Sequence, residues 1–354
     1  MKIVLIGNYG AGNLGDEMIL EGLLNTVKNV YPTAEITVLS GDPVHTEENH
    51  HIDASEKFPA GIKSFFRFFK TETPKIVQKS DLVILGGGGL FGSLSFHANI
   101  IWAIQALMAY YYRKPVVMYG QSVGTVKKSI LKKLLKKIFN KAKLIAVRDK
   151  KSIENLQKIG VSQKIYLMPD LAFSKELKNH GNKDRTVIIS LRQMAGLPKD
   201  FIKEIAEFIN WLAEEQDYHV EIVDFQKGHD DDSHLSRAVL NLTNSSNITY
   251  PNIDNLEDLY EHFAAASFVL GMRLHSIITA LKTKTPFTAI SYNEKVANFL
   301  DTAGFEYLNL EDLSFEKLKN SFKNPPKTSQ IEEFVKKASA HHRETETILK
   351  QINL

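Results

Sequence analysis

Three side chains in the last third of the chain, Arg273, His275 and Lys295, have the chemistry of an anion-binding site. Arg273 and His275 lie between an apolar run that predicts a strand ending at Leu270 and a pattern that predicts a helix from Ser276. Ligands of open α/β sheets bind at such strand-to-helix turns, where the helix N-terminus also favours an anion. We expect a clamp for a phosphate or carboxylate group. The alternative is that His275 caps a helix and Arg273 pairs with a structural carboxylate.

Arg148 is a fourth candidate, because it directly follows the apolar run of residues 144–147. Its guanidinium is always charged, and its planar shape suits phosphate and carboxylate groups. Arg148 could instead form a structural ion pair with Asp149 or Asp170.

Glycine-rich loops are expected after three apolar runs of the first half. The glycines of residues 7–17, 86–92 and 120–125 permit a close approach of the backbone to a ligand. The candidate substrate-binding or catalytic residues of these loops are Asn8, Tyr9, Asn13, Asp16, Glu17, Gly87, Gly88 and Gln121. A dinucleotide site is disfavoured, because the glycine spacing of residues 10–15 comes late after the first strand and no acidic residue ends the second.

Composition indicates a globular chain long enough for two domains. The 354 residues are 43% hydrophobic and 24% charged. Cysteine is absent, which excludes disulfides, thiolate catalysis and cysteine-bound zinc. The formal net charge of +3 is too small to indicate nucleic acid, and no such partner is expected.

No metal or cofactor is expected. The acidic run of residues 230–232 is interpreted as a polar loop, because consecutive carboxylates point in different directions. No secretory signal or membrane-spanning run is recognised, so a cytoplasmic location is expected, at the inner face of the plasma membrane if the protein contacts lipid.

Apolar runs alternate with helical patterns along the whole chain, which is typical of doubly wound parallel sheets. The expected strands cover residues 2–6, 36–39, 82–85, 116–119, 144–147, 165–167, 186–191 and 219–224, with further strands near Ile248, Phe268 and Phe287. We predict an N-terminal Rossmann-like domain over residues 1–174 and a C-terminal one over residues 185–326. A helix over residues 327–354 is expected to cross back to the first domain. The expected fold is α/β, with two facing Rossmann-like domains of GT-B type and a cleft between them.

Residues 127–139 alternate pairs of lysines with pairs of apolar residues, which predicts a strongly amphipathic helix. Such a helix could contact an anionic membrane surface. The alternative, slightly favoured, is a solvated outer helix packed on the sheet.

The ordered set of motifs resembles the polysaccharide pyruvyl transferase family, in particular members that pyruvylate the secondary cell-wall polymer anchoring bacterial S-layers. The matching segments are residues 7–10, 13–17, 85–90, 120–124, 147–149, 169–170 and 271–275. The resemblance implies the two-domain fold, phosphoenolpyruvate as donor, and an N-acetylmannosamine sugar of a lipid-linked saccharide as acceptor.

This chemistry agrees with the predicted clamp, because phosphoenolpyruvate carries both a phosphate and a carboxylate. Arg148, His275 and Lys295 would bind the donor, with Arg273 as a further cation or a structural residue. His275 would act as acid or phosphate ligand, and Asp16 or Glu17 would accept a hydroxyl proton. The alternative functions are a nucleotide-sugar glycosyltransferase on the same fold and a carbohydrate-binding protein without catalysis.

Overall fold

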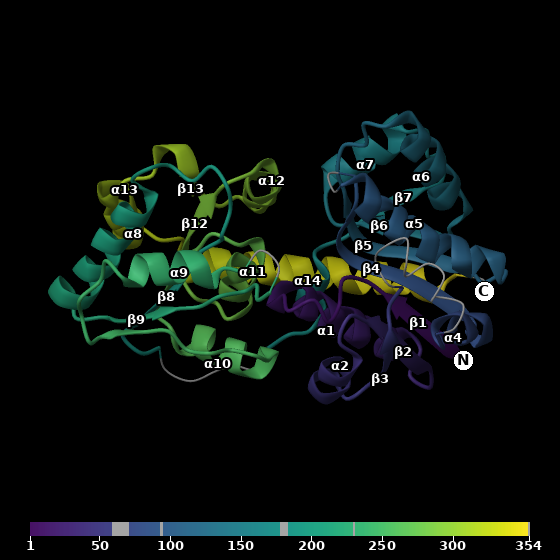
Figure 1. The fold of residues 1–354 in the computed structure, drawn as a ribbon, viewed down its shortest axis with the longest axis horizontal. Helices are drawn as coiled ribbons and strands as arrows, with labels where there is room; N and C mark the ends of the chain where they lie inside the picture. Colours follow the sequence, from purple (N-terminus) through teal and green to yellow (C-terminus); the bar gives the residue numbers. More distant parts are fainter. Residues whose placement is uncertain (59–70, 93–94, 178–182, 229–230, 353–354) are drawn as a thin grey trace. The chain divides into compact units, whose positions relative to one another are not determined.

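The computed structural model describes residues 1–58, 71–92, 95–177, 183–228 and 231–352. Contacts divide the chain into two compact units (Figure 1). Unit 1 comprises Met1–Ala11, Asp16–Lys175 and Ala338–Leu354, and unit 2 comprises Gly12–Gly15 and Glu176–Lys337. Each unit is built on its own parallel sheet, so the expected class of two parallel-sheet α/β domains is confirmed.

Unit 1 contains a seven-stranded sheet with the order β3-β2-β1-β4-β5-β6-β7. The strands are β1 (Lys2–Ile6), β2 (Glu35–Ser40), β3 (Asp53–Glu56), β4 (Leu82–Phe91), β5 (Val116–Val123), β6 (Leu144–Val147) and β7 (Ile165–Leu167). The helices are α1 (Leu14–Val30), α2 (Pro43–His50), α4 (Thr73–Lys79), α5 (Phe96–Tyr111), α6 (Ser129–Lys141) and α7 (Lys150–Lys158), followed by a 3₁₀ turn (Leu171–Ser174). The strand order reverses between β1 and β4, which makes their carboxyl ends the topological switch point of this sheet.

Both faces of the unit 1 sheet are buried. Val4 and Ile6 of β1 enter one hydrophobic cluster, whereas Ile3 and Leu5 enter the other. This alternation follows from the pleat of a strand, and apolar residues on both sides are typical of parallel sheets covered by helices.

Unit 2 contains a six-stranded sheet with the order β10-β9-β8-β11-β12-β13. The strands are β8 (Thr186–Ser190), β9 (His219–Ile222), β10 (Ile248–Thr249), β11 (Phe268–Gly271), β12 (Phe287–Ser291) and β13 (Tyr307–Asn309). The helices are α8 (Phe201–Asn210, continued by a π-helical turn, Trp211–Glu215), α9 (Ser233–Leu240), α10 (Leu256–Ala265), α11 (Leu274–Lys282), α12 (Glu294–Ala303), α13 (Phe315–Lys323) and α14 (Thr328–Lys350), with a 3₁₀ turn (Leu310–Asp312). Here the switch point lies between β8 and β11.

The C-terminal part of α14, from Ala338, belongs to unit 1. There the hydroxyl of Tyr119 donates to Oγ1 of Thr345 over 3.2 Å, and the hydroxyl of Tyr31 donates to the carbonyl of Leu349 over 3.2 Å. Both contacts fix the helix on the β5 and α1 side of this unit.

Two glycine-rich segments expected as loops are strand instead. β4 continues to Phe91 and β5 to Val123. A Cβ on Gly86 would lie 2.3 Å from Leu23 of α1, and a Cβ on Gly87 would lie 1.9 Å from Ile19. These glycines therefore allow α1 to pack directly on the sheet.

Three further elements differ from the expected pattern. β3 is short and largely polar, and β13 has only three residues, so alternation of apolar residues does not reveal either strand. The polar sequence of residues 226–236 also predicts a loop over this whole range, but α9 begins within it at Ser233. No helix of the described part of the chain is both long and apolar enough to cross a membrane.

Candidate active site

The switch point of unit 2 gathers most of the predicted cations. Arg273 and His275 follow β11, and Lys295 lies in the first turn of α12, just after β12. Arg192 follows β8, which is the neighbour of β11 in the sheet. The carboxyl ends of three adjacent strands therefore carry a cation or an imidazole each, where open α/β sheets bind ligands.

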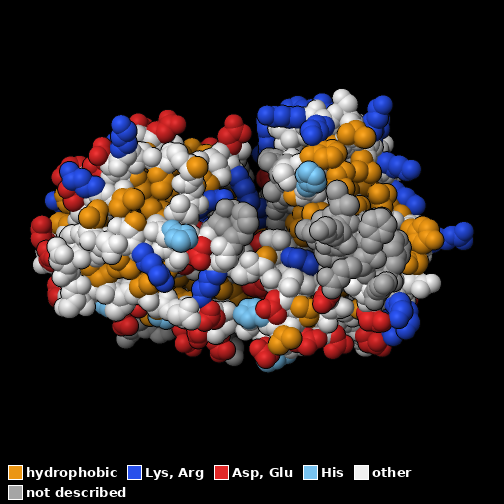
Figure 2. All heavy atoms as spheres, in the orientation of Figure 1, with side chains coloured by type: hydrophobic (Ala, Val, Ile, Leu, Met, Phe, Trp, Pro, Cys, Tyr) orange, Lys and Arg blue, Asp and Glu red, His pale blue; other side chains and the backbone are white. Residues whose placement is uncertain are grey.

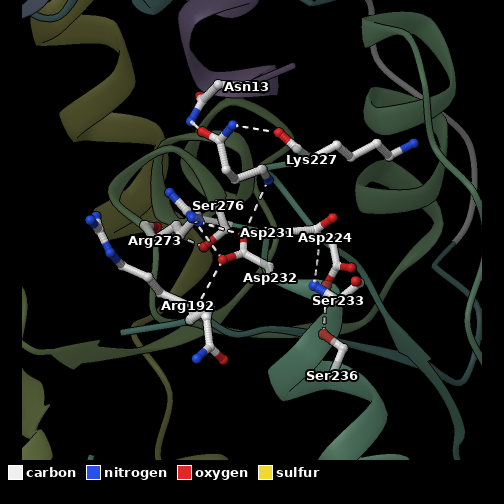
Figure 3. Close-up of polar contacts among 12 residues, drawn as sticks. Asn13, Arg192, Asp224, Lys227, Asp231, Asp232, Ser233, Ser236, Arg273 and Ser276 are labelled. Atoms are coloured by element: carbon white, nitrogen blue, oxygen red, sulfur yellow. Dashed lines mark hydrogen bonds and ion pairs between the residues drawn. The ribbon is translucent and has the colours of Figure 1, made fainter. Parts of the chain in front are cut away.

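Arg273 forms a buried ion pair with Asp232. Its Nε and Nη2 donate to the two carboxylate oxygens over 2.5 and 2.7 Å, and the Asp232 side chain is fully buried (Figure 3). Asp232 also accepts from the backbone N–H groups of Gln193 and Gln226 over 3.0 and 3.1 Å. Arg273 thus has the structural role given above as its alternative, and it holds the loops after β8 and β9 at the switch point.

A second buried carboxylate, Asp224, fixes the same loop. It accepts from Ser236 over 2.5 Å and from the hydroxyl of Tyr250. Burial raises the pKa of Asp224 above its usual value, although the hydrogen bond from Ser236 opposes this shift. The two contacts connect the end of β9 to α9 and to the segment after β10.

His275 lies in the first turn of α11, directly against Gly15. A Cβ on Gly15 would be 2.2 Å from Nδ1 of the imidazole. The segment of residues 12–15 is held in unit 2 by Asn13, whose Nδ2 donates to Oε1 of Gln226 over 2.6 Å, and by the N–H of Leu14 on the carbonyl of Phe225. The predicted residue Asn13 therefore positions the backbone beside His275.

Lys295 is exposed at the start of α12. Asn293 caps this helix, because its Oδ1 accepts from the N–H groups of Lys295 and Val296 over 3.1 Å each. The cap fixes the backbone from which the ammonium group of Lys295 extends.

Arg192 is a functional candidate that sequence reasoning missed. Its guanidinium stacks on the ring of Tyr292, 4.7 Å from the centroid, and its Nη1 donates to the Tyr292 hydroxyl. Its buried Nε has no hydrogen-bond partner among the residues that the structure describes. Leaving a buried donor unpaired costs free energy, so an acceptor supplied by a ligand would be favoured here. The signal available in the sequence was an arginine directly after a predicted strand.

The switch point of unit 1 carries the predicted carboxylates. Asp16 accepts from Nδ2 of Asn8 over 2.9 Å, and a Cβ on Gly88 would lie 3.5 Å from its Oδ1. Asp16 and Asn8 thus lie at the end of β1, next to the glycines of β4.

The carboxylate of Glu17 is bound by other groups of unit 1. It accepts from the N–H of Gly10 over 2.9 Å and contacts Nε2 of His50 at 2.9 Å, and both side chains of that pair are buried. Lys57, which was not predicted, reaches the carbonyl of Tyr9 at 3.4 Å. Burial lowers the pKa of Lys57, whereas the charges of Asp16 and Glu17 raise it.

Tyr9 is a core residue rather than a substrate ligand. Its side chain is 1% exposed, and its hydroxyl donates to the carbonyl of Gly86 over 3.0 Å. Burial raises the pKa of the phenol well above its usual value. The glycine-rich context made Tyr9 resemble a loop residue, but the ring instead packs beneath the turn.

Arg148 pairs with Asp170 at the end of β6, which is one of the two structural partners considered above. Its Nε also donates to Oγ of Ser122 over 2.7 Å, and both side chains of the ion pair are buried. Nη2 of Arg148 has no partner within the described ranges. Arg148 therefore retains one buried donor group after its structural contacts are made.

Gln121 is fully buried beside Arg148 in the sheet. Its Nε2 donates to the carbonyl of Leu85 over 3.0 Å, whereas its Oε1 finds no partner in the described part of the chain. The N–H of Arg148 donates to the carbonyl of Gln121 over 3.1 Å. Gln121 thus couples β4, β5 and β6 at the end of the sheet.

The acidic run of residues 230–232 contributes Asp232 to the switch point of unit 2. Asp230 lies outside the described residues, and Asp232 is committed to Arg273. Among the described residues, no group of three or more His, Cys, Asp or Glu side chains could hold a metal ion.

Two Rossmann-like domains, each with a parallel sheet, are the architecture of the GT-B type of fold. MnaA of S. aureus, solved with UDP, matches with a TM-score of 0.66 at 11% identity, covering 98% of this chain and 94% of that chain. The UDP-GlcNAc 2-epimerase of Methanocaldococcus jannaschii gives 0.64 at 13% identity over 99% of both chains. HepE of Anabaena, solved with UDP-glucose, gives 0.58 at 14% identity, covering 99% of this chain and 97% of that chain.

The sequence comparisons define the family. The family model for polysaccharide pyruvyl transferases matches residues 13–294, and the chain therefore belongs to this family. The amylovoran biosynthesis protein AmsJ of Erwinia amylovora is 25% identical over 362 residues, covering 86% of each chain. The chain is thus an enzyme of polysaccharide pyruvylation.

Proposed function

We propose that the chain transfers pyruvate from phosphoenolpyruvate to an N-acetylmannosamine-type sugar of a lipid-linked cell-wall saccharide and releases phosphate. The family supports pyruvylation of a polysaccharide, and AmsJ is named for the biosynthesis of one. Phosphoenolpyruvate as donor and the N-acetylmannosamine-type sugar as acceptor are what we propose in addition to this family activity.

The observation that carries the proposed donor is the set of cationic groups at the carboxyl ends of strands in each sheet. Unit 2 supplies His275, Lys295 and Arg192, and unit 1 supplies Arg148 with its remaining Nη2 donor. Phosphoenolpyruvate has a phosphate and a carboxylate, and guanidinium groups bind both with charge-assisted hydrogen bonds.

The proposed reaction uses these groups without a metal step. An acid protonates the methylene carbon of phosphoenolpyruvate, and a sugar hydroxyl bonds to the resulting oxocarbenium-like carbon and loses its proton. A second hydroxyl of the sugar then displaces phosphate from the same carbon, which closes a cyclic ketal. The proton consumed at the methylene carbon is balanced by one hydroxyl proton, and the other leaves with phosphate.

His275 is the proposed acid or phosphate ligand, because imidazole can change its charge near neutral pH. Asp16 is the proposed acceptor of a hydroxyl proton, because Glu17 is bound to Gly10 and His50. Asn8 would orient the Asp16 carboxylate through its 2.9 Å hydrogen bond.

The test compares two ligands by their effect on the melting temperature. Phosphoenolpyruvate should raise it in a concentration-dependent manner, because a ligand that binds only the folded state stabilises that state. A rise with uridine or guanosine diphosphate and none with phosphoenolpyruvate would instead support the nucleotide-sugar glycosyltransferase. Saccharide binding without turnover of any donor would support a binding protein.

A further inference from the structure

A continuous part of unit 1 carries positive charge without any acidic residue. Residues 82–148 contain eleven Lys or Arg residues and no Asp or Glu, although the whole chain has 44 Lys and Arg against 41 Asp and Glu. This stretch includes α5 and α6. Figure 2 shows blue side chains gathered over the part of unit 1 that Figure 1 labels α6 and α7.

The lysines of the α6 region have no acidic partner among the residues that the structure describes. These lysines are all exposed, and none forms an ion pair with a described residue: Lys127, Lys128, Lys132, Lys133, Lys136, Lys137 and Lys141. The neighbouring helix α7 instead pairs Lys151 and Lys158 with Glu154 at 3.3 and 3.9 Å. Like charges one helical turn apart destabilise a helix. If α6 only faced solvent, a mixture of acidic and basic side chains would make it more stable.

The apolar side of α6 is already used inside unit 1. Leu131, Leu135, Ile138 and Phe139 are at most 4% exposed and belong to the hydrophobic core. The helix therefore cannot bury this side in lipid while the unit stays folded. Any contact with a membrane must use the outward lysines.

Two exposed apolar side chains accompany these lysines. Five large hydrophobic residues are exposed within the described part of the chain, and two of them are Ile130 of α6, 68% exposed, and Tyr111 of α5, 81% exposed. α5 and α6 lie side by side, since the Tyr110 hydroxyl donates to the carbonyl of Ile138 over 2.9 Å. Lys141 lies over the Tyr110 ring at 4.6 Å.

We propose that this surface, defined by the α6 lysines with Ile130 and Tyr111, docks unit 1 on a bilayer that contains anionic phospholipid. Lysine ammonium groups suit the diffuse negative potential of such a bilayer. Ile130 and Tyr111 can insert into the interfacial region of the bilayer. The surface of a nucleic acid has no comparable region for exposed apolar side chains. The proposal goes beyond the proposed reaction and does not depend on it, because docking needs neither donor nor acceptor.

The experiment is co-sedimentation with phosphatidylcholine vesicles that either contain or lack phosphatidylglycerol. Two variants with the same loss of charge are compared. The docking variant replaces Lys132, Lys133, Lys136 and Lys137 with Gln. The control variant replaces the exposed lysines Lys317, Lys323, Lys327 and Lys336 of unit 2 with Gln.

The unsubstituted protein should sediment with the anionic vesicles and not with the neutral ones. The docking variant should lose about 100-fold or more in partition coefficient, and the control variant should stay within about threefold of the unsubstituted protein. The melting temperature of the docking variant should be unchanged or higher, because repulsion along α6 is relieved.

Three results would overturn the proposal. One is no sedimentation of the unsubstituted protein with anionic vesicles. Another is an equal loss in both variants, which would reflect net charge alone. The third is tighter binding to a short DNA duplex than to anionic vesicles at the same ionic strength, which would assign the surface to nucleic acid.

Discussion

Arg273 and Asp232 form a bidentate ion pair whose carboxylate is fully buried, and Arg273 is the N-cap of the helix whose first turn carries His275. The arginine that follows β11 therefore organises the switch point of unit 2. The imidazole of His275 lies two residues later, in the first turn of α11 and against Gly15.

This pair leads to the first prediction. Arg273→Ala should lower the free energy of unfolding of unit 2 by about 3–5 kcal/mol, because it leaves the Asp232 charge buried without a partner. Urea unfolding followed by tryptophan fluorescence measures this loss, since Trp211 lies in the unit 2 core. His275→Ala is the matched control and should cost much less. Equal stability of the two variants would mean that the pair does not hold the site.

The second prediction concerns Gly15. In an ordinary helix position, Gly→Ala stabilises by about 0.5–1 kcal/mol. Here the added Cβ would lie 2.2 Å from Nδ1 of His275, so we expect the imidazole to be displaced and pyruvyl transfer to fall by more than about tenfold. Steady-state kinetics with a melting curve separate the two effects. Full activity in Gly15→Ala would show that the position of His275 is not critical.

The third prediction concerns Arg192. Arg192→Gln should raise the concentration of phosphoenolpyruvate needed for half-saturation by about 10- to 100-fold, because a charge-assisted hydrogen bond to the donor is lost. Tyr292→Phe keeps the stacked ring and serves as the control, with a smaller effect. Calorimetric titration with phosphoenolpyruvate provides a readout independent of turnover, and unchanged affinity in Arg192→Gln would remove this residue from the donor site.

His342 of α14 gives the fourth prediction. Its side chain is buried in unit 1, and burial lowers the pKa of the imidazole from 6.5 to about 4. Between these values the unfolded chain binds a proton that the folded protein does not, so stability falls as the pH falls from about 6.5 to about 4. The loss attributable to His342 is up to about 3 kcal/mol.

The measurement for His342 is the melting temperature between pH 4 and pH 7 for the unsubstituted protein and His342→Leu. The variant should show a shallower decline over this range, because it has no group to protonate there. Parallel curves for the two proteins would contradict the assignment. Comparing the two proteins cancels the contribution of carboxylates that titrate in the same range.

The fold class could be predicted from sequence because its signals are local and repeated. Apolar runs such as residues 2–6 and 144–147 coincide with β1 and β6, and α14 begins at Thr328, one residue after the expected start. The edge strand β3 has the sequence Asp-Ala-Ser-Glu, so its pairing with β2 comes from backbone hydrogen bonds that leave no apolar pattern. Its existence could not be inferred from hydrophobicity.

The sequence places the candidate residues at the ends of strands but does not reveal the contacts of each side chain. An arginine after a strand has the same sequence signature whether it pairs with a carboxylate, as Arg273 does, or stacks on a tyrosine, as Arg192 does. The partner of each arginine lies 41 or 100 residues away in the chain. Tertiary packing alone decides between these outcomes.

We propose that Arg148, His275 and Lys295 are needed for pyruvyl transfer from phosphoenolpyruvate. The most direct measurement incubates the enzyme with phosphoenolpyruvate and a synthetic N-acetylmannosaminyl lipid, then determines released phosphate and the mass of the lipid product. We predict that one phosphate is released for each pyruvyl ketal added to the lipid. His275→Ala, Lys295→Ala and Arg148→Ala should lose both phosphate release and ketal formation. The melting temperature should be unchanged in His275→Ala and Lys295→Ala. Full product formation by His275→Ala and Lys295→Ala would contradict the account.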